Sequence, residues 1–267
     1  MNELVQAFDW RSRAVLFRNA LVYLRNWKTA FFPPAMEPVV FFVALGLGLS
    51  GVVGELQYGE RTITYAAFVA PGLLAYTGFT TPFYEALYGS YVRMFYQKTW
   101  DGILVTQVEL PHVVWGEILW AGLRGAMNAA VVAITLGVLH AIGMVELEWT
   151  WLPVLPLLAM VAGWAFGAAG LIFTGLVPSI DHMNYPTFLV GWPLSLVSNT
   201  IFPVPTHIPA IRFVMELNPI YHLAELCRSL LLLGRPAHVL PLFVSTAVLL
   251  VVAAFVDLRV LRRRVIG

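Results

Sequence analysis

Lysine, cysteine and charge are all scarce in this 267-residue sequence. The only cysteine, Cys227, excludes a disulfide within the chain and a thiolate cluster for zinc or iron–sulfur. The two lysines, Lys28 and Lys98, follow Trp27 and Gln97. A phosphate-binding loop of the Walker A type needs a lysine directly after a glycine. The sequence therefore predicts no nucleotide site of its own, and any work that needs energy would be driven by another chain.

Charged residues make up 12% of the sequence and hydrophobic residues 59%, with a mean hydropathy of +0.77. A soluble domain carries about 25% charged residues, roughly twice this share. A water-soluble protein of this size could not hide so much apolar surface, which excludes a soluble enzyme and a nucleic-acid binder. Disorder is excluded because disordered chains are polar and rich in charge. The composition indicates a polytopic membrane protein.

Motifs for metal and nucleophile chemistry are missing as well. A zinc-protease motif needs glutamate after histidine, but the six histidines are followed by Val, Ala, Met, Ile, Leu and Val. The sequence has no G-x-S-x-G elbow and no pair of carboxylates on adjacent helical turns. We therefore expect no catalytic residues, no metal site and no cofactor in this chain.

Long apolar segments define the expected architecture. A helix crosses the hydrocarbon core of a bilayer with roughly 20 apolar residues. Six segments meet this requirement, at residues 33–53, 62–88, 113–140, 151–176, 183–202 and 237–257. We expect an all-α membrane protein with a single domain over residues 1–267, in which residues 31–258 hold six transmembrane helices.

Two segments outside these spans have a different pattern. Residues 1–30 alternate apolar and basic side chains, which favours an amphipathic helix at the membrane surface, either as an anchor or as a docking element for a soluble partner. Residues 203–235 contain four prolines and several charges. This composition predicts either a broken, re-entrant hairpin, tolerated only where protein or water satisfies its backbone, or a pair of surface helices.

Basic residues predict the orientation. Nine of the sixteen lie in the first 30 residues or in the tail at residues 259–267, whereas loops 54–61 and 141–150 contain Arg61 alone. Positive charge stays on the cytoplasmic side of a membrane, so we expect both termini in the cytoplasm. Three arginines of the segment at 203–235 argue against this orientation, namely Arg212, Arg228 and Arg235, because they would lie on the outer side.

Few charges lie at membrane depth. Because a buried charge is costly there, Glu85, Glu117 and Arg124 are candidates for a substrate path or for ion pairs. The plainer interpretation places both glutamates at the cytoplasmic ends of their spans, where water would solvate them. Arg124 lies deeper, so we expect it to pair with a carboxylate or to line a wet cavity.

Aromatic residues at helical spacing extend this candidate path. They could line a route for an amphipathic substrate, or they could face lipid or a second copy of the chain. The residues of this set are Tyr76, Phe79, Phe83, Tyr185, Phe188 and Trp192.

Two stretches of the sequence carry a resemblance to a known family. The first comprises APGLL at 70–74, YGSYVR at 88–93, QKTWDGIL at 97–104, and GEILW at 116–120 with Arg124. The second comprises FP at 202–203, IP at 208–209, LNPIYH at 217–222, Arg228 and Gly234. Over nearly the whole chain the sequence resembles the permease subunits of type-2 ABC transporters, in the branch of nodulation-type lipooligosaccharide exporters. It departs from the family in having Thr106-Gln107 where Thr-Pro is common.

The resemblance implies six transmembrane helices, a cytoplasmic interface helix, and a short re-entrant hairpin before the last span. It also implies a homodimer in the bacterial inner membrane that pairs with two copies of an ABC ATPase subunit, which would hold ATP and Mg. The cargo would be a lipid-linked oligosaccharide or a similar amphipathic molecule.

The resemblance also assigns residues to roles. The loop at 93–112 would be the helix that couples to the ATPase, with help from the N-terminal helix. The expected coupling residues are Arg93, Gln97, Lys98, Asp101, Ile103, Leu104, Glu109, Arg11 and Arg18. The hairpin residues are Asn218, Pro219, His222 and Arg228.

Other functions stay open at this point. A drug exporter or another lipid exporter would have the same architecture. An ion-coupled transporter would use Glu85 and Glu117 without an ATPase. A membrane enzyme acting on lipids would draw on these two glutamates with Arg124 and His182, although no nucleophile–base pair can be named.

Overall fold

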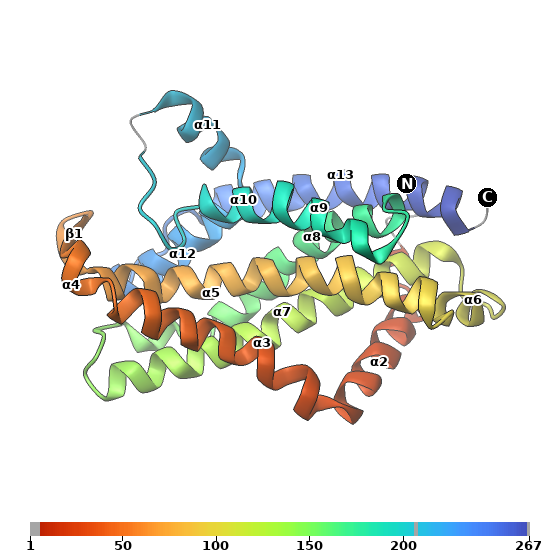
Figure 1. Ribbon diagram of the computed structural model, residues 1–267, viewed down its shortest axis with the longest axis horizontal. Helices are drawn as coiled ribbons and strands as arrows, with labels where there is room; N and C mark the ends of the chain where they lie inside the picture. The colour runs from red at the N-terminus through yellow and green to blue at the C-terminus, as the bar shows by residue number, and fades with distance from the viewer. Residues whose placement is uncertain (1–5, 206–207, 266–267) are drawn as a thin grey trace.

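The computed structural model describes residues 6–205 and 208–265, apart from the side chains of residues 29–35. Almost all of this part of the chain is helical (Figure 1). The α-helices are α2 (Trp10–Arg25), α3 (Trp27–Phe41), α4 (Ser50–Val53), α5 (Tyr65–Tyr84), α6 (Thr99–Leu104), α7 (Leu110–Ala141), α8 (Leu155–Leu176), α9 (Asn184–Pro186), α10 (Trp192–Leu196), α11 (Pro209–Leu217), α12 (Pro219–Leu233) and α13 (Val239–Val265).

Shorter elements join these helices. Strands β1 (Glu55–Tyr58) and β2 (Arg61–Thr64) form an antiparallel hairpin. The 3-10 turns are η1 (Gln6–Phe8), η5 (Trp149–Trp151) and η6 (Ile180–Met183). The π-helical turns are η2 (Phe42–Leu47), η3 (Glu85–Gly89), η4 (Val92–Tyr96) and η7 (Thr187–Gly191).

Within the described residues, four helices are long and apolar enough to cross a membrane: Met36–Val53, α7, α8 and α13. The expectation of an all-α, polytopic membrane protein is confirmed. The predicted second span lies in α5, which continues through η3 and η4 as one unbroken helix to Tyr96. The predicted fifth span, 183–202, is helical only as far as Leu196. The total of six spans remains a prediction.

Helix α5 lies at the centre of the core, against α7, α8 and α12 (Figure 1). Small residues let the helices approach closely. A Cβ added at Gly122 of α7 would lie 2.2 Å from the ring of Trp164 in α8, and one added at Gly72 of α5 would lie 1.8 Å from the Thr200 carbonyl oxygen. These glycines are therefore required by packing.

The predicted N-terminal helix is present as α2. Asp9 caps it by accepting a hydrogen bond from the backbone N–H of Arg11. Its buried stripe, however, consists of Ser12, Val15, Asn19 and Tyr23, which face α7. The opposite side exposes Phe17, Leu21 and Leu24.

The segment at 203–235 divides into two unlike helices. Helix α11 is amphipathic, exposes most of its residues and stands apart from the bundle (Figure 1). Helix α12 is buried over most of its length against α5 and α13. The prediction of two surface helices is therefore wrong for α12, since α12 is buried and its apolar side chains form part of the core.

The described ends of the chain lie at the same end of the bundle, where α6 is also located (Figure 1). The β1–β2 hairpin lies at the opposite end. The molecule thus has one end formed by α2, α6 and the last turns of α13, and another formed by the β-hairpin and the outer ends of α5 and α7.

Candidate functional site

A single buried carboxylate connects three separate elements. Glu117 of α7 is 2% exposed. Its oxygens accept hydrogen bonds from Asn19 of α2 (3.1 Å) and from the indole N–H of Trp100 in α6 (3.3 Å). Ser90 (2.9 Å) and the guanidinium of Arg93 (3.1 Å from Nε), both at the end of the α5 helix, also donate to it. The interface helix, the short loop helix and the core are therefore tied at one point.

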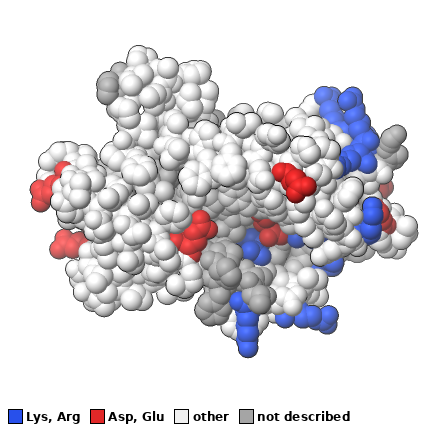
Figure 2. All heavy atoms as spheres, in the orientation of Figure 1, with Lys and Arg blue, Asp and Glu red and all other residues white. Residues whose placement is uncertain are grey.

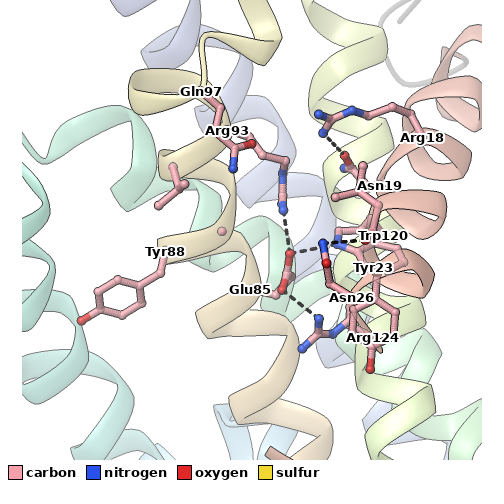
Figure 3. Close-up of a pocket in the computed structure, with 13 residues that line it drawn as sticks. Arg18, Asn19, Tyr23, Asn26, Glu85, Tyr88, Arg93, Gln97, Trp120 and Arg124 are labelled. Atoms are coloured by element: carbon pink, nitrogen blue, oxygen red, sulfur yellow. Dashed lines mark hydrogen bonds and ion pairs between the residues drawn. The ribbon is translucent and has the colours of Figure 1, made fainter. Parts of the chain in front are cut away.

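Arg93 extends this cluster to a second glutamate (Figure 3). Its Nη1 donates to Oε1 of Glu85 at 2.8 Å, and the same oxygen accepts the indole N–H of Trp120 at 2.8 Å. The side chain of Arg93 is 13% exposed. Burial works to lower the pKa of Arg93, but Glu117 and Glu85 outweigh burial and raise it. Arg93 therefore stays charged between two carboxylates.

Arg124 lies on the other side of Glu85. Its Nη1 is 3.6 Å from Oε2 of Glu85, and its guanidinium stacks 4.3 Å from the ring centre of Tyr23. Its Nε is buried and has no hydrogen-bond partner. The expectation that Arg124 pairs with a carboxylate or lines a cavity is confirmed on both counts.

Two adjoining clefts open onto this cluster. One, of about 350 Å³, lies between α2, α5 and α7, and the other, of about 490 Å³, reaches Glu37 of α3. Both are lined by Glu85, Tyr88, Gly89 and Arg124. Arg124 thus lies where the two clefts meet.

The expectation that water solvates Glu85 and Glu117 at the ends of their spans is wrong. Both carboxylates are held by arginines inside the protein, and they converge with Arg124, which their spacing in the sequence did not indicate. The partners Asn19 and Trp100 were missed. Ser12 and Asn19 lie seven residues apart, two turns along one face of α2, and this polar stripe was a signal for a buried contact.

The predicted coupling residues fall into two groups. Lys98 and Asp101 are exposed and form an ion pair of 3.8 Å on the surface of α6. Lys98 begins this helix in the left-handed conformation, with φ of 52°. Gln97 and Glu109 are also exposed, and Ile103 and Leu104 are half-buried. This group offers a charged surface with an apolar edge.

The second group faces inward. Arg93 does not contribute to the exposed face of the loop, because its guanidinium points into the core toward Glu117. Arg18 donates to Asn19 and to Thr99 at the start of α6, and Arg11 is half-buried on α2. Arg18 thus links α2 to α6, and Arg93 links the end of the α5 helix to α7.

The aromatic residues of the expected substrate path do not form one surface. Phe79 and Phe83 are each 1% exposed and pack against the core. Tyr76 borders a small cleft together with Trp192. Tyr185 and Phe188 are exposed on the outside of the bundle.

The hairpin residues hold α12 in place. Asn218 caps α12 through the backbone N–H of Ile220 and donates to the Leu194 carbonyl, while Pro219 takes the first helical position. His222 contacts the carbonyl of Glu216. Arg228 is fully buried, stacks on Phe68 and donates to the carbonyls of Phe68 and Asn199 and to the carboxylate of Glu225.

Metal chemistry finds no support in the described part of the chain, where no three His, Cys, Asp or Glu side chains are grouped to hold an ion. His182 contacts Ser179 at 2.8 Å on the surface.

Comparison with known proteins gives a consistent result. Residues 12–232 match the family of ABC-2 type transporters. Nodulation protein J of Rhizobium meliloti (strain 1021) is 30% identical over 259 residues, which cover 91% of this chain and 94% of that protein. Nodulation protein J of Rhizobium leguminosarum bv. viciae is 30% identical over 94% of this chain and 93% of that protein. The chain therefore belongs to the ABC-2 type transporter family, in the branch that contains nodulation protein J.

Proposed function

We propose that this chain is the permease subunit of an ATP-driven exporter in the bacterial inner membrane. A separate ABC ATPase subunit, present in two copies, would bind ATP and Mg, and two copies of this chain would form the transport path. The cargo would be a lipid-linked oligosaccharide or a similar amphipathic molecule. Membership of the ABC-2 family and the likeness to nodulation protein J support this assignment.

The observation that carries the proposal is the cluster at Glu117. Asn19, Trp100 and Arg93 reach this one carboxylate from α2, α6 and the end of the α5 helix. A push on α6 from outside would reach α7 through Trp100, since a buried, fully hydrogen-bonded carboxylate resists separation from its partners. The cluster thus links the surface of the loop to the membrane-crossing helices.

The surface of α6 is the proposed docking site of the ATPase. Lys98 and Asp101 are more than half exposed, and Ile103 and Leu104 provide an apolar edge. ATP binding would close the two ATPase subunits, which would push on α6 and on α2. The two permease copies would then tilt and open a path at their interface toward the outer side.

The distribution of charge supports cytoplasmic termini. Lys and Arg gather at the end of the molecule that carries the described termini and α6, whereas acidic residues are visible along the whole length of this face (Figure 2). Positive charge marks the cytoplasmic side of membrane proteins. The proposed docking surface and the termini would therefore face the same compartment as the ATPase.

An ion-coupled transporter needs carboxylates that are free to take up and release ions. Glu85 and Glu117 are instead held by Arg93 and, for Glu85, also by Arg124. The oxygens of both carboxylates are already occupied by hydrogen bonds from arginine, serine, asparagine or tryptophan side chains, which leaves them little capacity to bind an ion. The pairing favours the ATP-driven exporter.

The test reverses the charges on α6. The double variant Lys98→Glu/Asp101→Lys keeps an ion pair within α6 but inverts the pattern that a partner would meet. We expect loss of co-purification with the ATPase subunit and loss of transport, with normal expression. Arg212→Glu, on the exposed helix α11 at the other end of the molecule, is the matched control. Unchanged co-purification and transport in the double variant would defeat the proposal.

A further inference from the structure

Three guanidinium groups border the cleft between α2, α5 and α7. Arg18, Arg93 and Arg124 line it, with Glu85 as the carboxylate among them (Figure 3). Glu117 lies behind Arg93. Even with both glutamates counted, the three arginines leave an excess of positive charge around the cleft.

The arginines differ in how fully they are occupied. Arg93 donates to Glu85, Ser90 and Glu117 and is saturated. Arg124 makes one long contact of 3.6 Å with Glu85, and its Nε is buried without a partner. A buried donor without an acceptor costs free energy, so the guanidinium of Arg124 is held less firmly than that of Arg93. Arg124 is therefore the arginine of this cleft that is most available to bind a ligand.

Arg18 is a second positively charged side chain that is available to bind an anion. Its guanidinium donates to two uncharged partners, Asn19 at 3.0 Å and Thr99 at 3.3 Å. Burial lowers the pKa of Arg18, and the nearby positive charge of Arg93 lowers it further. An anion in the cleft would relieve the repulsion between these arginines.

Apolar side chains of α2 lie beside the cleft. Val22 lines it and is 47% exposed, and next to it on α2 Leu21 and Leu24 are also exposed. An amphipathic helix of this kind lies at the level of lipid headgroups, with its apolar side chains among acyl chains. A molecule that enters past α2 would leave its acyl chains in the membrane and bring only its headgroup to the arginines.

We infer that the cleft between α2, α5 and α7 is a binding site for the phosphate-bearing headgroup of a membrane amphiphile, held by Arg124 and Arg18. Arginine suits this role because its planar fork binds two phosphate oxygens at once. Tyr23 and Glu85 orient Arg124 for the ligand. The inference rests on the proposed function and deepens it, since it names an anionic headgroup as the feature of the amphiphile that the permease recognises.

The experiment measures binding to the purified permease in detergent, without any ATPase. Native mass spectrometry would follow retention of phosphatidylglycerol, with diacylglycerol as the probe that lacks the phosphate and inorganic phosphate as a soluble competitor. We expect Arg124→Gln to lower retention of phosphatidylglycerol about tenfold, as befits the loss of one charge-assisted hydrogen bond. Arg13→Gln, an exposed position on the same helix as Arg18, should bind like the unaltered protein.

Arg18→Gln provides a second variant if Arg124→Gln fails to fold, because the partners of Arg18 are uncharged. The inference is overturned if neither variant binds less phosphatidylglycerol than Arg13→Gln does, or if diacylglycerol is retained equally well. Displacement of the lipid by inorganic phosphate at equal concentration would also overturn it, by assigning the site to a soluble anion. None of these outcomes depends on the ATPase, so they leave the proposed transport function to its own test.

Discussion

At the scale of single residues, the cluster around Glu117 dominates the energetics of the site. Glu117 and Arg93 are buried opposite charges with additional hydrogen bonds to Asn19, Ser90 and Trp100. Breaking a buried pair of this kind by removing one partner costs about 3–5 kcal/mol, because the other charge is left uncompensated. Replacing both partners costs far less.

The variant Glu117→Leu should therefore be strongly destabilised, by about 3–5 kcal/mol, since Arg93 would keep only Glu85 as a partner and the buried donors of Asn19, Ser90 and Trp100 would lose their acceptor. In the double variant Glu117→Leu/Arg93→Met the loss should be smaller than the sum of the losses in the two single variants. Thermal unfolding of the purified protein, followed by circular dichroism, measures both. Additive losses in the double variant would show that the two side chains do not act as a pair.

Asp9 offers a test at the start of α2. Asp9→Ala should weaken the docking of α2 through loss of the cap, whereas Asp9→Asn keeps an acceptor and should have little effect. Hydrogen exchange of the α2 amides measures the difference. Equal protection of α2 in Asp9→Ala and the unaltered protein would contradict the role of the cap.

The carboxylate of Asp9 should also make the stability of α2 depend on pH. The hydrogen bond from the backbone N–H of Arg11 lowers the pKa of Asp9 in the folded protein. A lowered pKa contributes stability that is fully present above the unfolded value of about 3.9 and is lost as the pH falls through the folded value. Protection of α2 should hold at neutral pH and fall only in strong acid. A loss between pH 5 and 7 would point to another group.

At the scale of elements, the outer part of α5 is fastened by α12 and the turn before α11. Arg228 reaches from α12 across Phe68 to the carbonyl of Asn199, and Gly72 of α5 faces the carbonyl of Thr200. No side chain fits between α5 and this turn. The contact sets the distance between the core helix and residues 199–200.

Gly72→Ala should thus destabilise the protein by about 1–3 kcal/mol, because the added methyl group overlaps a backbone oxygen that is itself held by packing. Gly51→Ala in α4 is the matched control, since a Cβ there meets nothing within 4 Å. Thermal unfolding distinguishes the two. If the Gly72→Ala protein were as stable as the Gly51→Ala protein, the backbone at residues 199–200 would be shown to shift away from α5 at little cost.

The same elements show what a sequence can and cannot predict. The long helices α7, α8 and α13 follow from apolar length alone, since a bilayer leaves the backbone no alternative. The meeting of Asn19, Arg93 and Glu117 depends on how α2 crosses α7 and on how far the α5 helix continues beyond the membrane. Local periodicity in the sequence determines neither of these two features. For this reason the sequence led us to expect solvated glutamates, whereas the structure has a buried cluster.

At the scale of the whole molecule, basic residues gather at one end of the bundle (Figure 2). Fusion reporters test the orientation that this distribution predicts. A fluorescent protein fused after Gly267 should fold and fluoresce, because it would lie in the cytoplasm. Alkaline phosphatase inserted in the β1–β2 turn at Gly59 should be active, because the enzyme matures only outside the inner membrane. The reverse pattern would invert the proposed topology.

The unbroken helix from Tyr65 to Tyr96 has a mechanical consequence. At 1.5 Å per residue it is a rod of about 48 Å. It is held near one end, where Gly72 faces the Thr200 carbonyl, and again further along, where Gly170 of α8 packs on the Phe83 carbonyl. A rod held at two separate points does not pivot about either one. A displacement delivered at α6 would therefore move the long helix together with α7 and α8 rather than swing it alone.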